Sequence, residues 1–237
     1  MTTDWTALER RLMETARLRR RPVAIAFLDA PPAGVPAYRG RQPSGCSFWR
    51  LAAEGRAFYT VPGDHYNCAI GSYTHQISLP PERARELDQT LAFMTGLGYV
   101  RMEEVPAIPR LPRSPGAVMY APLGETPQAP DVVVLADAPG RLMLVQEAAG
   151  RAGVASTLPL LGRPTCMALP AALAAGAVLS TGCVGNRVYT DVGDEALYVV
   201  LPGRSLEAVV DALTGIRQAN DELAAYHGER RRTLASE

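Results

Sequence analysis

The sequence predicts a mixed α/β (α+β) fold that is internally duplicated, with two related half-domains packed about a pseudo-twofold axis. The first observation is that the apolar run "VAIAFLDAP" (23–31) returns as "VVVLADAP" (132–139). The second is that each run is followed by two cysteines and then by a longer segment with helical periodicity. Five landmarks recur in the same order at offsets of about 110–120 residues, which chance does not explain.

Each half is expected to contain short strands and a long C-terminal helix. The runs 23–28 and 132–136 are continuous, apolar and closed by Asp and Pro, as is typical of buried strands. The segments 79–97 and 201–216 carry apolar residues at spacings of three and four, which indicates one buried face of a helix in each half. We treat these two helices as counterparts. A further helix is expected over about residues 4–19.

The segment between the halves is rich in proline, which disfavours helix and interrupts strands. Only "AVMYAPL" (117–123) within it has the pattern of a strand, and the rest is expected to be extended or turning chain. One compact domain with five parts is therefore predicted. These are an N-terminal helix (1–20), the first half (21–102), the proline-rich linker (103–130), the second half (131–228) and a basic tail (229–237).

Charge and hydropathy exclude several classes of partner. The chain has 24 basic and 24 acidic residues, so no global field would attract nucleic acid or an anionic membrane. The clusters "RLRRR" (17–21) and "ERRRT" (229–233) are interpreted as solvated helix ends. No apolar run approaches membrane-spanning length, and the N-terminus has no secretory pattern, so we expect a cytoplasmic protein. A homo-oligomer is left open.

Four cysteines, two in each half, are the main candidates for chemistry. Cys46 and Cys166 are equivalent in the repeat, as are Cys68 and Cys183, and each lies beside Gly, Pro or Asn. Packing about a twofold axis would bring all four thiols to one place, where soft sulfur ligands suit an iron–sulfur cluster or a tetrahedral zinc. The spacings of 22 and 17 residues lack the C-x₂-C signature, and buried cysteines that simply pack remain the alternative.

The polar neighbours of the second cysteines differ between the halves. In the first half His65 is a candidate ligand or acid–base group, or a plain loop residue. In the second, Arg187 offers a forked donor for a carboxylate or phosphate, unless it pairs with Asp191 or Asp194. Trp49 would form a wall of the pocket or pack in the core. The residues expected to line a substrate pocket are Trp49, Tyr66, Asn67, Asn186 and Arg187.

Other catalytic signatures are missing from the sequence. There is no G-x-G-x-x-G and no G-x-x-x-x-G-K-[ST], so nothing indicates a dinucleotide or P-loop phosphate site. No G-x-S-x-G marks a nucleophile elbow, and three histidines make a histidine-rich metal site a poor candidate. Aromatic residues do not interleave with basic ones, so a base-stacking surface is not indicated.

Several of these motifs together resemble the uncharacterised ArCR family, domain of unknown function 169. They are "SGCSFWRLAAEG", "DHYNCAIGSYT", "GRPTCMALPAAL" and "GCVGNRVYTDVGDEALYVVLPG", within a resemblance that runs from about residue 20 to 228. The family pattern has cysteines at the four positions named above and "GNR" at 185–187. The resemblance implies that the four cysteines form a set, and it implies no activity or metal.

We therefore expect a cysteine-ligated metalloprotein that binds one [4Fe–4S] cluster at the interface of the two halves. An adjacent polar pocket would take a small anionic molecule, with His65 and Arg187 as catalytic candidates and redox, lyase or sulfur-transfer chemistry all open. The alternatives are a structural zinc site, a thiol enzyme in which His65 or Arg187 lowers a cysteine pKa, and a metal-free binding protein with buried thiols.

Overall fold

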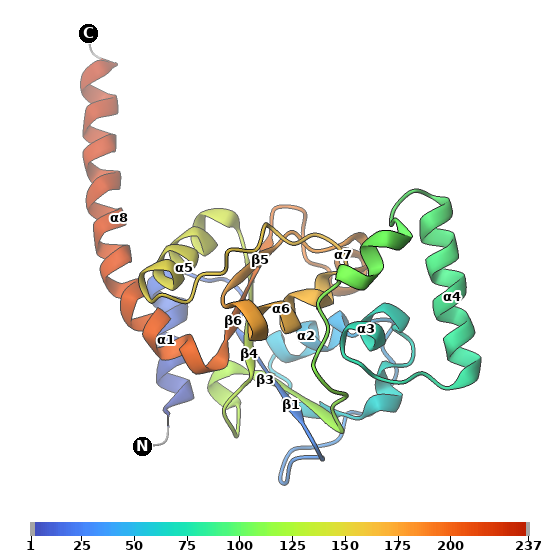
Figure 1. Cartoon of the computed structure of the whole chain (residues 1–237). Helices are drawn as coiled ribbons and strands as arrows, with labels where there is room; N and C mark the ends of the chain where they lie inside the picture. Colours follow the sequence, from blue (N-terminus) through green and yellow to red (C-terminus); the bar gives the residue numbers. More distant parts are fainter. Residues whose placement is uncertain (1–2, 236–237) are drawn as a thin grey trace.

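The computed structural model describes residues 3–235 and places a single six-stranded sheet at the centre of the chain (Figure 1). The strand order is β2-β3-β1-β4-β6-β5, and every neighbouring pair is antiparallel. The mixed α/β class is as expected. The strands are β1 (Val23–Leu28), β2 (Phe58–Thr60), β3 (Ala117–Pro122), β4 (Val132–Asp137), β5 (Val178–Ser180) and β6 (Leu197–Pro202).

The strand pairing is the same on both sides of the sheet centre. At the centre Ala24 of β1 faces Val133 of β4. On one side Val23 faces Pro122 of β3, and on the other Val132 faces Pro202 of β6. At the edges, Thr60 faces Val118 just as Ser180 faces Tyr198. The register of strand pairing is therefore the same whether the sheet is followed outward from β1 or outward from β4.

One face of the sheet is covered by α1 (Trp5–Ala16), α5 (Pro139–Arg151) and α8 (Leu206–Leu234), grouped on the left of Figure 1. Asp4 caps α1 by accepting a hydrogen bond from the Ala7 N–H, and Pro139 opens α5 where a missing N–H costs nothing. Alternate strand residues such as Val133 and Leu135 pack against these helices in an aliphatic core.

The opposite face carries α2 (Cys46–Ala53) and α6 (Ala168–Ala175), with α3 (Ala69–Thr74) and α7 (Val184–Thr190) beside them. Its core is built partly from aromatic rings. These include Phe48, Phe58, Tyr120 and Tyr198. Short 3-10 turns lead into this layer, namely η1 (Pro62–His65) and η4 (Thr165–Met167), while η3 (Leu123–Glu125) and η5 (Gly203–Ser205) follow β3 and β6.

The helix α4 (Pro81–Gly96) stands at the periphery of the molecule, on the right of Figure 1. None of its residues is buried; Phe93 is 67% exposed, and Leu97, which follows the helix, is 66% exposed. It contacts α3 and continues into η2 (Met102–Ala107) before the chain returns to the sheet as β3. We call residues 78–110 the cap.

The expected equivalence of 79–97 and 201–216 is wrong. α4 lies between β2 and β3, whereas α8 follows the last strand β6, so the two helices hold different places in the order of elements. The cause lies in the proline-rich segment, whose strand 117–122 is a fully buried central strand rather than a connector. The helix expected near the N-terminus is α1, and residues 229–234 continue α8. Within residues 3–235 no helix combines the length and apolar character needed to cross a bilayer.

Candidate cysteine-lined site

All four cysteines lie where a helix of the second layer begins. Cys46 is the first residue of α2, and Cys166 lies in η4, which runs directly into α6. Cys68 and Cys183 immediately precede α3 and α7. Since the first backbone N–H groups of a helix lack partners within it, these positions offer donors to a sulfur ligand.

The structure brings the four cysteines to one cavity of about 350 Å³. All four are free thiols, Cys46 and Cys166 are buried, and Cys68 and Cys183 are partly exposed. The thiols are close enough that the charge of each of the other three would act on Cys46. Residues more than 130 positions apart in the chain are thus joined at one site.

Burial raises the pKa of three of these thiols. It raises the pKa of Cys46 and of Cys166 far above the usual range, and negative charge on neighbouring cysteines adds to the effect. Burial also raises the pKa of Cys68, although the backbone N–H groups of Gly45 and Gly71 oppose it. In the free protein these groups are therefore neutral thiols, and only a bound cation would favour their ionisation together.

Short-range donors surround the sulfur atoms. The Asn186 amide lowers the pKa of Cys46 and the Thr74 hydroxyl lowers that of Cys166, both against the larger effect of burial. A Cβ on Gly71 would lie 2.8 Å from Sγ of Cys68, so a glycine is needed for the backbone to approach the sulfur. These contacts are the kind that orient and stabilise sulfur ligands.

Side chains from neighbouring segments hold Cys183 and its surroundings in place. Thr165 Oγ1 accepts a hydrogen bond of 2.6 Å from the Cys183 N–H. Asn186 is buried, and its Oδ1 accepts from the Tyr198 hydroxyl at 2.8 Å. Its Nδ2 has no partner with hydrogen-bond geometry among the described residues, although it faces Cys46 closely enough to affect that thiol.

The cap supplies the outer wall of the cavity. Its apolar contribution comes from Leu91, Met94, Val100, Val105 and Ile108. Arg163 brings a positive charge to the wall, and its guanidinium lies 4.7 Å from the ring centre of Tyr99. Glu86 of α4 also lines the cavity. Sequence reasoning missed Arg163 and the cap because it sought polar side chains only beside Cys68 and Cys183, although "GRPTC" places Arg163 close to Cys166.

Of the polar residues expected at the pocket, Asn67 and Asn186 line the cavity. Arg187 does not. Its guanidinium donates to the carbonyl oxygens of Thr181 and Gly193 at 2.6 Å each and to that of Ala196 at 3.1 Å, with a weak contact of 3.9 Å to Asp194. Arg187 thus ties together the loops on both sides of α7, and the anion-binding role expected for it is corrected.

His65 also lies outside the cavity lining. Its Nε2 is 2.8 Å from Thr60 Oγ1, and its ring packs against Phe48. Burial lowers its pKa to about 3, so it is neutral at physiological pH. Its carbonyl oxygen accepts the Cys68 N–H at 2.9 Å, which makes His65 a support for the cysteine loop rather than an acid–base group in the pocket.

Tyr66 and Trp49 are likewise not among the residues that line the cysteine cavity. Trp49 is buried and packs edge-on against Tyr198, with 6.0 Å between ring centres. The indole lines a different pocket, at the other end of α2. With respect to the cysteine cavity, Trp49 is therefore a core residue and not part of the wall.

No preformed metal cage exists in residues 3–235, where no three His, Cys, Asp or Glu side chains stand in an arrangement that could hold an ion. The four sulfur atoms line a cavity instead of closing on one point. The donor set nevertheless fits a thiolate-ligated centre, because four soft ligands share one cavity with N–H donors directed at two of them.

A family model matches residues 11–212, which is most of the chain. This chain belongs to the uncharacterised ArCR family, domain of unknown function 169. The ArCR protein is also similar to the uncharacterized protein MJ0308 of Methanocaldococcus jannaschii, with 28% identity over 183 residues that span 73% of this chain and 77% of the relative. No solved structure matches the chain.

Proposed function

We propose that this ArCR protein is a cysteine-ligated metalloprotein that binds one [4Fe–4S] cluster through Cys46, Cys68, Cys166 and Cys183. The observation that carries the proposal is the convergence of all four thiols on a single cavity, each from the start of a helix. Four cysteines are the full complement in the chain, and none is used elsewhere. Such a cluster, when bound through all four cysteines, would supply one-electron transfer.

The surroundings of the thiols support a centre that carries negative charge. The N–H groups of Gly45 and Gly71 act on Cys68, and the Asn186 amide acts on Cys46. Hydrogen bonds to ligand sulfurs stabilise an anionic cluster and tune its potential. The raised pKa of the buried thiols means that binding must release protons, so affinity is expected to increase with pH.

The site is proposed to lie at the junction of two halves that arose by internal duplication. The matching registers of β1–β3 with β4–β6 and of β2–β3 with β5–β6 support this origin. The cysteines occupy matching positions along the chain. Cys46 and Cys166 lie at the start of the helices that precede β2 and β5, and Cys68 and Cys183 precede the next helices, α3 and α7. The cap would then be an insertion in the first half, because α7 leads to β6 through the short segment 191–196.

The cavity beside the thiols is proposed to hold a small molecule that carries one negative charge on an apolar body. Arg163, in place of Arg187, supports the negative charge, and the apolar cap residues support the apolar body. Redox, lyase and sulfur-transfer chemistry all remain compatible with this lining, and whether the protein is an enzyme rests on identifying that molecule.

The alternative of a thiol enzyme has less support. A nucleophilic cysteine needs a lowered pKa or an adjacent base. Here burial raises the pKa of Cys46, Cys68 and Cys166, and His65 is neutral, bonded to Thr60 and outside the cavity lining. A closed zinc site remains the second metal candidate, because zinc takes the same four thiolates.

The metal content of protein purified without oxygen tests the proposal. We expect about four irons and four sulfides per chain and absorbance near 400 nm. Cys166→Ser should lose the chromophore, and Gly71→Ala should weaken it because the added methyl meets Cys68 Sγ at 2.8 Å. Gly150→Ala, where a Cβ has open space, is the matched control. Stoichiometric zinc, or colourless protein without iron after reconstitution, would overturn the cluster.

A further inference from the structure

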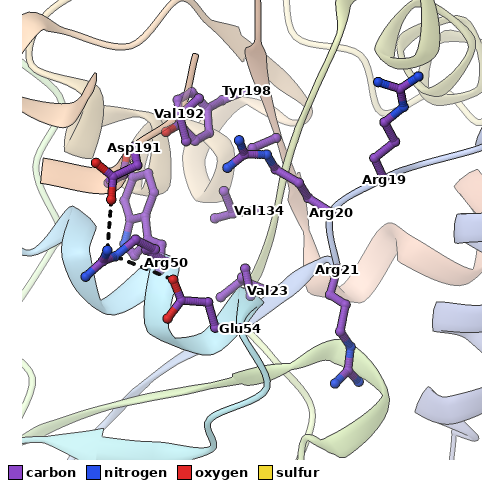
Figure 2. Close-up of a pocket in the computed structure, with 14 residues that line it drawn as sticks. Arg19, Arg20, Arg21, Val23, Arg50, Glu54, Val134, Asp191, Val192 and Tyr198 are labelled. Carbon is purple, nitrogen blue, oxygen red and sulfur yellow. Dashed lines mark hydrogen bonds and ion pairs between the residues drawn. The ribbon is translucent and has the colours of Figure 1, made fainter. Parts of the chain in front are cut away.

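A second pocket, of about 300 Å³, lies at the carboxyl ends of the two helices whose amino ends carry Cys46 and Cys183 (Figure 2). Its walls come from the ends of α2 and α7, from β1 and β4, and from the arginine run that follows α1. None of its lining residues belongs to the cysteine cavity. The pocket is thus a separate feature, built partly from the basic cluster 17–21 of the sequence.

The interior of this pocket is apolar and partly aromatic. Val23 and Val134 of the central strands line it, together with the rings of Trp49 and Tyr198. Trp49 is only 4% exposed, yet its Nε1 has no hydrogen-bond partner within residues 3–235. Because that N–H is itself enclosed by the chain, the Trp49 ring offers the pocket apolar contact.

The arginines around the pocket differ in how far they are already paired. Arg21 donates to Glu9 and to Glu125 at 2.7 Å each, and Arg50 pairs with Asp191 at 2.9 Å. The Arg20 side chain has neither an ion pair nor a hydrogen bond in the part of the chain that the structure describes.

Figure 2 distinguishes the three consecutive arginines further. Arg20 extends across the pocket toward Tyr198, above Val134, whereas Arg19 and Arg21 point away on either side. One unpaired guanidinium therefore stands over an apolar floor. A guanidinium in this state is the usual partner of a carboxylate or phosphate.

We propose that this pocket binds a small molecule in which a carboxylate or phosphate is attached to a flat, ring-sized apolar group. The oxyanion pairs with Arg20, and the apolar group lies over Val23 and Val134 beside the Trp49 ring. The site is independent of the metal proposed at the cysteines.

Benzoate and phenyl phosphate are suitable probes, measured by calorimetry and by fluorescence of Trp5→Phe, which leaves Trp49 as the single tryptophan. We expect saturable binding of at least one probe, and Arg20→Gln should weaken it at least tenfold. Arg10→Gln, an exposed change on α1 away from the pocket, should leave it unchanged. Inorganic phosphate and benzyl alcohol should bind more weakly, because each lacks one of the two features.

Arg20 is exposed, so its substitution is expected to leave the fold intact, which circular dichroism checks. Ala53→Phe gives a second approach, because Ala53 lines the pocket and the larger ring should fill it and abolish binding. Binding of neither probe at millimolar concentration would overturn the proposal. So would binding that survives both Arg20→Gln and Ala53→Phe.

Discussion

The two faces of the sheet differ in what they bury. Against α1, α5 and α8 the core is aliphatic, and its buried acids are fully paired, Glu9 with Arg21 and Asp137 with Arg141. Against α2 and α6 the core holds aromatic rings and one of the thiols, that of Cys46. Buried polar atoms without partners within residues 3–235 also gather on this second side. They are on Trp49, Arg50, His75, Tyr120 and Asn186, whereas Gln146 is the example from the helices of the first face.

This difference separates the part that stabilises the fold from the part that carries the site. An unpaired buried polar group costs on the order of 1–3 kcal/mol, so a structure that keeps several on one face gains something there other than stability. The first face makes up for that cost through aliphatic burial. Substitutions on the first face should therefore change stability alone, and those on the second should change chemistry as well.

The largest effect is expected from the aliphatic face. Leu213→Ala in α8 removes a fully buried side chain and should lower the free energy of unfolding by about 3 kcal/mol. Urea denaturation measures this loss. The iron content per folded chain should stay at the wild-type level, and a colourless but folded Leu213→Ala protein would contradict the separation of the two faces.

Arg187→Ala should have the next largest effect on the free energy of unfolding. Three carbonyl oxygens lose their donor, so we expect a loss of about 2 kcal/mol in the free energy of unfolding together with weaker metal retention, because the loops that flank Cys183 are released. Thermal denaturation with and without metal measures both. A variant of unchanged stability that had lost only ligand binding would restore Arg187 as an anion anchor.

The pH dependence of stability should reflect the buried imidazole of His75. Burial lowers its pKa to about 4, below the value near 6.5 of the unfolded chain, so the unfolded state binds more protons as pH falls. Stability from this group is complete above about pH 6.5 and declines as pH falls through the folded pKa. Between pH 6.5 and 5.0 the loss is about 2 kcal/mol.

His75→Phe removes this titration, and the ring nitrogens have no partners within the described residues to lose. Urea denaturation at pH 7.5 and 5.0 should show the variant losing about 2 kcal/mol less than the wild type on acidification. The remaining dependence should include His65, whose pKa is also lowered by burial. Equal losses in the two proteins would show that His75 is not buried as described.

The smallest effect on stability should come from Arg163→Gln. The side chain lies at the cavity wall against Tyr99, so the free energy of unfolding should change by about 0.5 kcal/mol or less. Metal content should be unchanged while a bound anionic ligand is lost, as calorimetry on metal-loaded protein would measure once that ligand is known. Loss of the metal in Arg163→Gln would make this residue part of the scaffold.

The strands and the grouping of the cysteines were within reach of sequence reasoning for definite reasons. The runs 23–28 and 132–137 are continuous and apolar because both faces of the central strands are buried. The landmarks that recur in the sequence then indicated that Cys46 shares its local surroundings with Cys166, and that Cys68 shares its own with Cys183. The strand at 117–123 was expected but was assigned to the linker, so its place inside the sheet and the position of α4 before it were not predicted.

The direction in which each polar side chain points could not be predicted from the sequence. Arg187 and His65 have the residue types of an active site, but the first turns toward main-chain carbonyls and the second into an aromatic core. Arg163 was passed over although it lies three residues before Cys166, and Arg20 was interpreted with the cluster 17–21 as part of a solvated helix end. Which of several arginines remains unpaired depends on contacts between distant segments, such as Arg21 with Glu125, and no local pattern contains that information.

Iron X-ray absorption of the anaerobically reconstituted wild-type protein tests the central claim most directly. If the four thiols converge on one cluster, the iron should show a shell of sulfur and a short iron–iron distance, and the Cys46→Ser, Cys68→Ser, Cys166→Ser and Cys183→Ser variants should each lose or alter it. A first shell of nitrogen or oxygen, or a spectrum that any three of these variants leave unchanged, would contradict a cluster held by these cysteines.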